Sequence, residues 1–523
     1  MKEKLLQKKL FWGFLALGTA MLACSRQAPE ASPWNPSDID MIKTPCPAGV
    51  DLSGVCLITP TPTVPWFLPP TRSPDQPIFT PTPDEPRIVP TLRQDPDEYT
   101  VQPGDTLAII ANRYSVSYEE IARLNEITDP NSLDIGQFLL IPAPTPAGEA
   151  PGFKIIPDSE LVYGPMSTTL DLAAFVSEKN GFLADYVEEV EGVERTGSEI
   201  LLKVSEDFSV NPRLLLAVLE YSSGWVSSKD VIDSYQKYPI GYFDENRSGL
   251  YKQLAYAAIN LNRGFYLWEV NAIPAWLLAD GAIIPVNSRI NAGTAGVQQL
   301  MAVLFAKDAW SEAVSEEGLY QTYSDLFGYP FDYSIEPFIP SNLQQPEMQL
   351  PFEPGIAWSF TGGPHPGYGE GSAWAAVDFA PPGELPGCVD SNAWVTAIAN
   401  GLVVKSENGI VVTDLDGDGF IQTGWSVLYL HVKTEDRIES GEFVKAGDRI
   451  GHPSCEGGVS SGTHLHLARR YNGMWISADG DIPFILDGWV SKGTGKLYDG
   501  FLVKNGISIE AWNGKREENQ IQR

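Results

Sequence analysis

The histidines of this chain are few and concentrated, since all five lie in the C-terminal third of the sequence. Two of them, His464 and His466, are separated by one residue in Thr463–Leu467, where polar and apolar side chains alternate. Alternation predicts a strand, and residues i and i+2 of a strand face the same side. Two imidazoles on one face suit a metal ligand beside a catalytic base.

A third histidine and a carboxylate lie in segments of the same kind. Val427–His431 reads as a strand that would bring Tyr429 and His431 to one face. Asp378 lies among apolar residues in Ala376–Phe379, which also predicts a strand. A lone buried acid is costly unless it is paired or bound to a metal. The pattern therefore favours a metal site in this part of the chain.

Five short motifs of this region follow one another in a fixed order. They are Asp378-Phe-Ala-Pro-Pro-Gly383, Val395-x-Ala-x-Ala-x-Gly401-x-Val403, Tyr429-Leu-His431, Val444-Lys-Ala-Gly447-x-x-Ile450-Gly451 and Ser461-Gly-Thr-His464-Leu-His466. In this order they resemble the lysostaphin-type zinc peptidases, which cut peptide bridges of the bacterial cell wall. The resemblance implies that His365, Asp378 and His466 bind zinc. It also implies that His431 and His464 form the catalytic pair, as general base and as stabiliser of the tetrahedral intermediate.

The chemistry of such a site fits these side chains. Two neutral imidazoles and one carboxylate leave Zn²⁺ with a net positive charge and one open position for water. That charge brings the pKa of the water down towards about 7 and polarises the scissile carbonyl. One departure is that His365 lies thirteen residues before Asp378, whereas the family's first ligand usually lies four before the aspartate. We expect the intervening Gly367, Gly369 and Gly371 to let the segment loop out and return His365 to the metal.

Two further features of this region have plainer interpretations. Asp414, Asp416 and Asp418 alternate along a loop that looks like a calcium loop, so Ca²⁺ is one interpretation of it. The twelfth position from Asp414 is Trp425 and not Glu, so the loop is no EF-hand, and a solvated hairpin turn is the alternative. His452 lies in a Gly-His-Pro turn, for which we expect a structural role.

The elements that must position these residues are short apolar strands separated by Gly, Pro and Asp turns. Trp394–Val404 predicts two strands or one bent strand, and Trp425–Val432 and Arg449–Gly451 predict two more. This pattern predicts an all-β fold for residues 346–515, and the resemblance implies that this C-terminal domain is a metallopeptidase built on an antiparallel sheet.

The start of the chain predicts export and attachment. Four lysines accompany the apolar run Leu10–Leu22, which has the length of a signal-peptide core and is short for a membrane span. The run ends in Met21-Leu-Ala-Cys24, which resembles the bacterial lipobox and implies that residues 1–24 are a lipoprotein signal peptide with Cys24 lipidated. An ordinary secretory signal is the alternative. Residues 25–98 are rich in proline and threonine, and they predict a semi-rigid linker without a core.

The cysteine count agrees with an exported protein. Without Cys24, four of the five cysteines remain, an even number that suits disulfides. Cys46 and Cys56 share one short segment, and we expect them to pair. Cys388 and Cys455 both lie in the C-terminal domain and are expected to pair there, with four buried free thiols as the alternative. The second bridge would tie the loop after the predicted aspartate ligand to the loop before the His-Leu-His motif.

Residues 99–142 predict a compact module of two strands and two helices. Its motifs are Tyr99-Thr-Val-Gln-Pro-Gly-Asp-Thr-Leu107, Ile121-Ala-Arg-Leu-Asn125 and Gly136-Gln-Phe-Leu-Leu-Ile-Pro142. They strongly resemble the LysM domain, a βααβ fold that binds N-acetylglucosamine polymers, including peptidoglycan glycan. The resemblance implies a sugar groove flanked by Gly104, Asp105, Thr106, Leu107, Asn131 and Ile135. Turn formation and helix capping are the alternative roles, above all for Gly104 and Asp105.

Residues 155–340 read as mostly helical. Asn211-Pro212 predicts a helix start and Gly224 a stop. With a later Gly-rich segment, this helix resembles the lysozyme-like fold of lytic transglycosylases, in which a catalytic Glu precedes a Ser. Here Ser222 holds the Glu position, and Glu220 lies two residues earlier, about 200° around the helix. Serine cannot supply the proton that glycan cleavage needs, so we expect a degenerate sugar-binding or structural domain.

Bulk composition limits the partners. Lysine and arginine total 36 against 67 acids, so the formal net charge is −31. Such a chain repels nucleic-acid phosphates and anionic lipid headgroups. We therefore expect no nucleic-acid partner, and a membrane contact only through the lipid anchor. A length of 523 residues exceeds a single core and agrees with several domains.

Together these features predict a multidomain, extracytoplasmic cell-wall protein, anchored by lipid to a bacterial membrane. The leading interpretation is a zinc endopeptidase that LysM places on glycan strands and that cuts the peptide crosslinks of peptidoglycan. The alternative is a non-catalytic activator of cell-wall amidases, a role known for lipoproteins that join LysM to a degenerate peptidase domain. Bound metal separates the two. A transglycosylase is a third interpretation, which the absent Glu disfavours.

Overall fold

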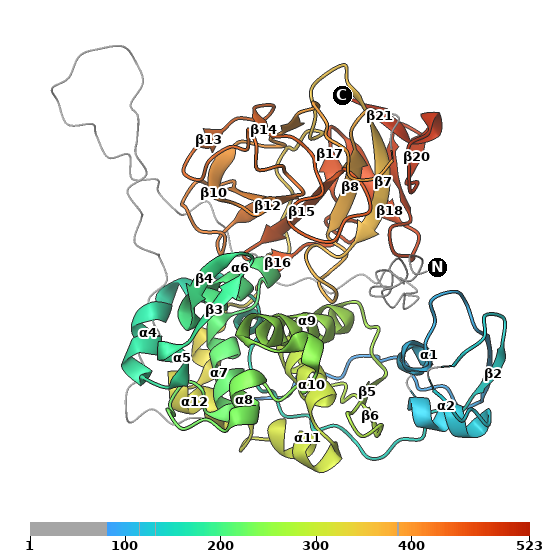
Figure 1. The fold of residues 1–523 in the computed structure, drawn as a ribbon, viewed down its shortest axis with the longest axis vertical. Helices are drawn as coiled ribbons and strands as arrows, with labels where there is room; N and C mark the ends of the chain where they lie inside the picture. Colours follow the sequence, from blue (N-terminus) through green and yellow to red (C-terminus); the bar gives the residue numbers. More distant parts are fainter. Residues whose placement is uncertain (1–80, 115, 131, 384–385) are drawn as a thin grey trace, which may run out of the picture.

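The structure is a computed structural model with three successive regions: a small module, a helical region and a β region (Figure 1, blue, green and orange to red). It describes residues 81–114, 116–130, 132–383 and 386–523. The predictions for Cys24, Cys46 and Cys56 therefore lie outside the described residues. Within the described part of the chain, no helix is long and apolar enough to cross a membrane.

The N-terminal module has the predicted order strand, helix, helix, strand. Its elements are β1 (Asp97–Thr100), α1 (Leu107–Tyr114), α2 (Tyr118–Leu124) and β2 (Phe138–Ile141). β1 and β2 pair antiparallel, and Leu139 and Ile141 of β2 enter a core with helix residues such as Ile110. Ser117 caps α2 by accepting a hydrogen bond from the Glu120 amide at 3.1 Å. The two helices give the two-stranded sheet the apolar cover that it needs.

Helices dominate the middle region, as the sequence predicts. In chain order its elements are α3 (Asp158–Leu161), η2 (Pro165–Thr169), α4 (Leu172–Lys179), α5 (Phe182–Asp185), β3 (Val187–Val190), β4 (Val193–Thr196), α6 (Gly197–Phe208), α7 (Pro212–Ser223), α8 (Asp233–Lys237), η3 (Glu245–Arg247), α9 (Leu250–Glu269), β5 (Ala275–Leu277), β6 (Ile283–Pro285), α10 (Ala292–Leu304), α11 (Lys307–Ala313), α12 (Leu319–Phe327) and η4 (Pro330–Tyr333). The predicted helix start and stop are confirmed. α7 begins after Asn211, whose side chain accepts a hydrogen bond from the Arg213 amide at 2.9 Å, and ends at Gly224 with φ +68°.

The C-terminal region is built from antiparallel strands. They are β7 (Ala357–His365), β8 (Ala376–Ala380), β9 (Val395–Thr396), β10 (Gly401–Glu407), β11 (Ile410–Asp414), β12 (Trp425–Leu430), β13 (Phe443–Val444), β14 (Arg449–Gly451), β15 (Leu465–Tyr471), β16 (Met474–Trp475), β17 (Ile485–Leu486), β18 (Trp489–Gly493), β19 (Gly500–Lys504), β20 (Ile507–Glu510) and β21 (Gln520–Gln522), with the short helix η5 (Glu517–Asn519). The main sheet has nine strands in the order β13-β10-β11-β12-β15-β8-β7-β21, with β16 paired to β15. β17 to β20 form a second sheet. The predicted Trp394–Val404 segment forms two strands, β9 and β10, which lie in different sheets.

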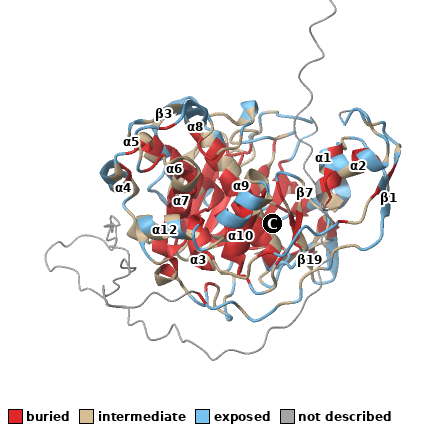
Figure 2. Cartoon of the chain, turned by 90° about the horizontal axis from the view of Figure 1, so that it is seen from below, coloured by how far each residue is buried: buried red, intermediate tan, exposed pale blue. Residues whose placement is uncertain are grey.

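The main sheet separates two hydrophobic clusters. On its strands, residues such as Tyr429 and Leu467 enter a core inside the β region. Their neighbours in sequence, Leu428 and Ala468, join the cluster formed by the helical region. Strand alternation thus gives one face of the sheet to the helices. Figure 2 shows α7 and α10 as largely buried, at the centre of the molecule.

The prediction that Tyr429 and His431 share a face is wrong. Tyr429 is buried in the core, where its hydroxyl accepts a hydrogen bond from the Ile398 amide at 2.9 Å. β12 ends at Leu430, and His431 adopts a left-handed backbone conformation with φ +68°. A left-handed residue breaks the alternation of the strand. The ring of His431 consequently lies beside His464.

Charged groups also join the helical and β regions. Lys405 on β10 reaches two acids of α6, with Nζ 3.0 Å from Glu206 Oε2 and 2.8 Å from Asp207 Oδ1. Lys203 places a second ammonium 2.9 Å from Asp207. Burial alone would raise the pKa of Asp207, but these two ammonium groups lower it below its usual value. The contact between the two regions is therefore electrostatic as well as apolar.

Candidate metal centre

Three neighbouring strands bring one side chain each to the same place. His466 on β15 and Asp378 on β8 are partners in the strand register. His365 ends β7, which pairs with the other edge of β8. All three are buried, with exposed fractions of 7%, 7% and 1% respectively. The loop 366–375 returns His365 to the site, as the glycines in it led us to expect.

Hydrogen bonds fix which ring atoms face one another. His365 donates Nδ1–H to the Gly363 carbonyl at 2.8 Å, and His466 donates Nε2–H to the Gly367 carbonyl at 2.8 Å. The opposite nitrogen of each neutral ring then carries no proton. These nitrogens lie 2.9 Å apart, and 3.1 and 3.2 Å from Asp378 Oδ1, which has no hydrogen-bond donor among the described residues. Three acceptors thus converge in the way that a bound cation would satisfy.

The three acceptor atoms form a group that could hold a metal ion. Two imidazole nitrogens and a carboxylate oxygen are a donor set that zinc accepts while a fourth position stays open. Burial alone raises the pKa of Asp378, whereas positive charge on the His365 and His464 rings holds it well below its usual range. A metal ion bound between the neutral rings would act in the same direction and keep the carboxyl ionised. Burial lowers the pKa of His466, which favours the neutral ring that can bind a metal.

His431 and His464 lie beside this group, with ring centroids 4.5 Å apart. His431 donates Nδ1–H to the Glu456 carbonyl at 2.7 Å. His464 donates Nδ1–H to the Gly462 carbonyl at 2.7 Å. The Nε2 atom of each neutral ring is therefore left to take a proton. Burial, with the neighbouring His464 and His466 rings, lowers the pKa of His431 to about 3, so this ring is neutral near pH 7.

Three family descriptions match consecutive parts of the chain. They are the LysM domain at residues 99–142, the LasA N-terminal domain at 154–339 and Peptidase family M23 at 385–478. The chain carries an M23 peptidase domain. The M23 match includes the other three histidines of the site but begins after His365 and Asp378. It is the structure that brings these two residues to the M23 histidines.

Named relatives agree with the M23 match. Protease LasA of Pseudomonas aeruginosa (strain UCBPP-PA14) is 26% identical over 351 residues, which cover 62% of this chain and 75% of LasA. Beta-lytic metalloendopeptidase of Lysobacter enzymogenes is 26% identical over 166 residues, which cover 30% of this chain and 89% of that protein. These relatives support a metallopeptidase.

Solved structures of two peptidases resemble parts of the chain. The M23 metalloprotease pseudoalterin from the deep sea is 23% identical, covering 35% of this chain and 100% of its own, with a TM-score of 0.28. The catalytic domain of lysostaphin from Staphylococcus simulans is 24% identical, covering 24% of this chain and 89% of its own, with a TM-score of 0.17. TM-scores this low carry no argument about the fold, which rests on the strand order described above.

A disulfide braces the wall of the M23 site. Cys388 and Cys455 are bonded at an S–S distance of 2.06 Å, as the sequence predicts. The bridge ties the loop after β8 to the segment before β15. Thr463, next to His464, accepts a hydrogen bond from the Val389 amide at 2.9 Å and holds the same loop. The loop that follows Asp378 and the segment that precedes His464 are thus fixed to one another.

Sequence patterns give no signal for Tyr498, yet its ring stacks on His365 with centroids 4.3 Å apart. Tyr498 lies between β18 and β19, beyond the M23 match, and has a left-handed backbone with φ +63°. That conformation is rare for a bulky side chain and recurs at functional sites. Tyr498 is half exposed, and its partial burial, with the nearby Asp378 and Glu370 carboxylates, raises the pKa of the phenol to about 12. The phenol therefore stays protonated and able to donate a hydrogen bond.

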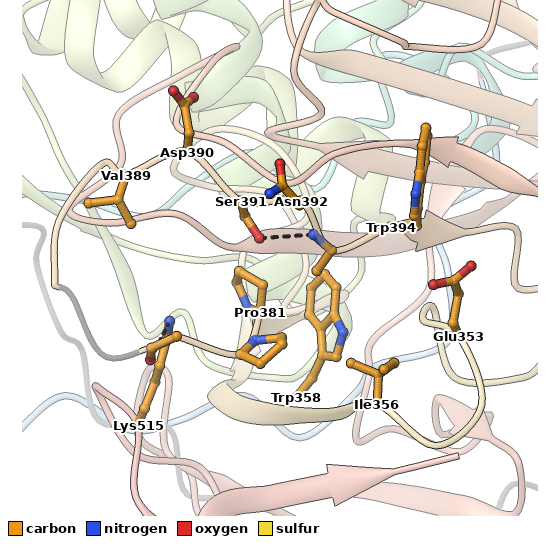
Figure 3. A pocket seen from close by; sticks show the side chains of 13 residues that line it. Glu353, Ile356, Trp358, Pro381, Val389, Asp390, Ser391, Asn392, Trp394 and Lys515 are labelled. Carbon is orange, nitrogen blue, oxygen red and sulfur yellow. Dashed lines mark hydrogen bonds between the residues drawn. The ribbon is translucent and has the colours of Figure 1, made fainter.

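A cavity of about 430 Å³ lies beside the end of β8, shown in Figure 3. Trp358, Pro381, Trp394 and Lys515 are among its lining residues, and no residue of the metal centre lines it. Lys515 donates a hydrogen bond to the Gly383 carbonyl at 3.3 Å. The cavity has the size of a small-ligand site but is separate from the chemistry described above.

The predicted calcium loop forms a hairpin turn between β11 and β12. Asp414, Asp416 and Asp418 lie close enough together to hold an ion. Asp414 accepts a hydrogen bond from the Gly419 amide at 2.8 Å, and Asp418 accepts one from the Phe420 amide at 2.8 Å. These bonds are what the hairpin interpretation expects. No comparison supports calcium here, which stays a prediction.

Glu220 is not arranged as a catalytic acid. Its carboxylate accepts hydrogen bonds from the Val226 and Ser227 amides, both at 3.0 Å, and from the Ser227 hydroxyl. The carboxylate thereby holds the turn that follows α7. Because this region matches the LasA N-terminal domain, its lysozyme-like resemblance stays a prediction.

The candidate sugar-binding turn of the LysM domain is held by its own hydrogen bonds. Asp105 accepts a hydrogen bond from the Tyr99 hydroxyl at 2.6 Å. Thr106 accepts one from the Ile109 amide at 3.2 Å and so caps α1. Gly104 has φ +89°, as a tight turn requires. These are the turn and capping roles that the sequence left open.

The remaining sugar-binding candidates differ in their surroundings. Leu107 is buried in the module's core, whereas Ile135 is 70% exposed. Asn131 lies outside the described residues. The role of all six candidates in glycan binding stays a prediction.

Proposed function

We propose that this chain is a zinc-dependent endopeptidase that hydrolyses peptide crosslinks of peptidoglycan. The observation that carries the proposal is the convergence of acceptor atoms from His365, Asp378 and His466, with no donor from the described residues among them. A divalent cation satisfies all three and keeps one position for water. The M23 match and the names of the relatives support a peptidase.

The residues of the chain would move the proton of the reaction. Zinc, when bound, lowers the pKa of its water and polarises the scissile carbonyl. His464 presents an Nε2 that can take the proton of the attacking water, because a backbone carbonyl already holds its Nδ1–H. His431 lies beside it, with its own Nδ1–H held by a backbone carbonyl in the same way. The ring that has taken the proton carries Nε2–H and can stabilise the tetrahedral intermediate or protonate the leaving amine.

The other regions would bring the peptidase to its substrate. The LysM domain at 99–142 would bind glycan strands and keep the peptidase domain at 346–515 near their crosslinks. Lipid on Cys24, followed by the linker 25–98, would tether the protein to a membrane on its extracytoplasmic side. The helical domain at 155–340 would act without cleaving glycan, because Glu220 is engaged in its own turn.

Zinc content and wall digestion, measured together on purified protein, test the proposal. The wild type should bind about one zinc per chain and release new amine ends from peptidoglycan. His466→Ala should lose both, because it removes one of three ligands. His452→Ala is the matched control and should keep both. His452 donates an Nδ1–H hydrogen bond to the Ala393 carbonyl at 2.8 Å and lies outside the group that could hold the metal. A wild type without zinc and without cleavage would contradict the proposal and favour the amidase activator.

A further inference from the structure

The loop 366–375 joins two of the ligand strands, β7 and β8, and it also contacts the ligand on a third. The Gly367 carbonyl accepts the Nε2–H of His466 at 2.8 Å, which leaves His466 Nδ1 facing the other ligands. The Gly367 amide donates to the Ala373 carbonyl at 3.0 Å and closes the loop. The loop between β7 and β8 therefore orients His466 on β15. At metal sites, hydrogen bonds to the far nitrogen of a ligand imidazole orient the ring in this way.

The same loop packs against the helical region. Gly371 lies on α9, where a β-carbon would be 2.4 Å from the Ile259 carbonyl oxygen. Gly369 lies against the Phe208 ring at the end of α6, and the Tyr368 ring meets Phe208 edge-on with centroids 5.2 Å apart. The backbone φ is +112° at Gly371 and +68° at Gly369. Conformation and close approach both require glycine at these two positions.

A second contact reaches Gly367 from the helical region through Trp475. The indole covers Gly367 so closely that a β-carbon there would be 2.5 Å from Trp475 Cε3. The Trp475 amide donates a hydrogen bond to the Tyr266 hydroxyl of α9 at 2.9 Å. The indole N–H lies 3.5 Å from the Phe208 carbonyl oxygen. Trp475, Tyr266 and Phe208 are all buried, so packing holds the indole in place.

We propose that the helical region positions His466 through the loop 366–375 and thereby sets the affinity of the metal centre. The inference rests on the zinc site proposed above. Gly371 and Tyr266 are positioning residues, because each fixes a segment that in turn contacts Gly367. The long spacing between the first two ligands supplies this docking loop. Part of the ligand orientation of the M23 site thus comes from a region outside the M23 domain.

Zinc affinity of the full chain, measured by competition with a chromophoric chelator, tests this inference. Gly371→Ala should weaken zinc binding about 10-fold or more, as loss of outer support does, because the new methyl group pushes the loop off α9. Tyr266→Phe should weaken zinc binding about threefold, since it removes only the hydroxyl that accepts a hydrogen bond from the Trp475 backbone amide. Gly441→Ala is the matched control and should keep wild-type affinity. Gly441 also has a positive φ of +93°, but no described atom lies within 4 Å of its β-carbon position.

The absorption spectrum of the cobalt-substituted protein adds a readout that a general loss of stability does not change. Gly371→Ala should alter the Co²⁺ bands, which report ligand geometry, while Gly441→Ala should not. Wild-type affinity and spectrum in both Gly371→Ala and Tyr266→Phe would overturn the inference and leave the peptidase proposal standing. An equal loss of affinity in Gly441→Ala would also overturn it. A wild type that binds no zinc would overturn both proposals, and if Gly371→Ala fails to fold, Tyr266→Phe decides.

Discussion

Glu220 and Asp378 are both acids at places where a resemblance predicts chemistry, and their surroundings differ. The Glu220 carboxylate accepts hydrogen bonds from the Val226 amide and from both the amide and the hydroxyl of Ser227. Asp378 Oδ1 receives none from the described residues and faces two ring nitrogens without protons. An acid whose oxygens are satisfied holds a turn together. Converging acceptors need a cation to offset their repulsion.

The largest effect is expected at Asp378, because its substitution removes the centre of the acceptor cluster. In Asp378→Asn we expect zinc binding to be lost and hydrolysis to fall more than about 10³-fold, beyond the cost of one lost stabilising donor. Metal analysis and amine release measure these effects. A variant that keeps zinc and activity would show that the acceptor cluster is not the site.

Next in size are the effects of replacing the two histidines beside the cluster. His431→Ala and His464→Ala should each keep about one zinc per chain and lose about 10²- to 10⁴-fold in kcat, the usual contribution of a positioned acid or base. Neither belongs to the group that could hold the metal. Zinc analysis with steady-state kinetics on a crosslinked peptide separates binding from proton transfer. Loss of zinc in either variant would move that ring into the ligand set.

Strand alternation made much of this site predictable from the sequence. Leu465 and Leu467 are fully buried on one face of β15, and His466 faces Asp378 on the other. Period-two patterns are local, so a short segment is enough to assign the faces. The thirteen-residue spacing between His365 and Asp378 is not part of such a local pattern. The glycines between them indicate only that a loop can form there, and in the structure this loop brings the His365 ring back beside Asp378 and His466.

Contacts between distant segments left no such signal. Tyr498 reaches His365 from a loop beyond the M23 match, and no periodic pattern marks that approach. The left-handed backbone at His431 depends on the Ser454 amide and hydroxyl, which hold the His431 carbonyl at 2.7 and 3.0 Å. Leu428 is apolar whether its face meets the β core or the helical region. Sequence alone therefore could not show that α6 and α9 pack against the sheet that carries the ligands.

Asp207 sharpens the comparison, because it is as buried as Asp378 but is paired with cations. Burial alone would raise its pKa, and Lys405 and Lys203 instead lower it. A group whose folded-state pKa is depressed adds stability above its unfolded value, about 3.9, and that stability is lost as pH falls through the folded pKa. Wild type should therefore lose stability below about pH 4, and Asp207→Asn should lose less in that range.

At pH 7, Asp207→Asn should cost about 2 to 3 kcal/mol of unfolding free energy. This is below the cost of a fully unpaired buried charge, because Glu206 and Glu407 still face Lys405 at 3.0 and 3.4 Å. Urea unfolding at pH 7 and at several lower pH values gives both numbers. Equal stability and equal acid sensitivity in variant and wild type would show that this ionic contact does not hold the two regions together.

The smallest effect is expected at Glu220, where the same acid-to-amide change provides the counterpart to Asp378→Asn. Glu220→Gln keeps the side-chain length and one carbonyl acceptor, so the turn after α7 should lose about 1 kcal/mol or less. Peptide-bond hydrolysis should be unchanged, because the carboxylate only holds that turn. Mass spectrometry of digested peptidoglycan should find no anhydro-sugars from either protein. Anhydro-sugars released by the wild type and absent with Glu220→Gln would make Glu220 a catalytic acid despite its hydrogen bonds. Carboxylate oxygens that already accept hydrogen bonds would then no longer distinguish structural from catalytic acids in this molecule.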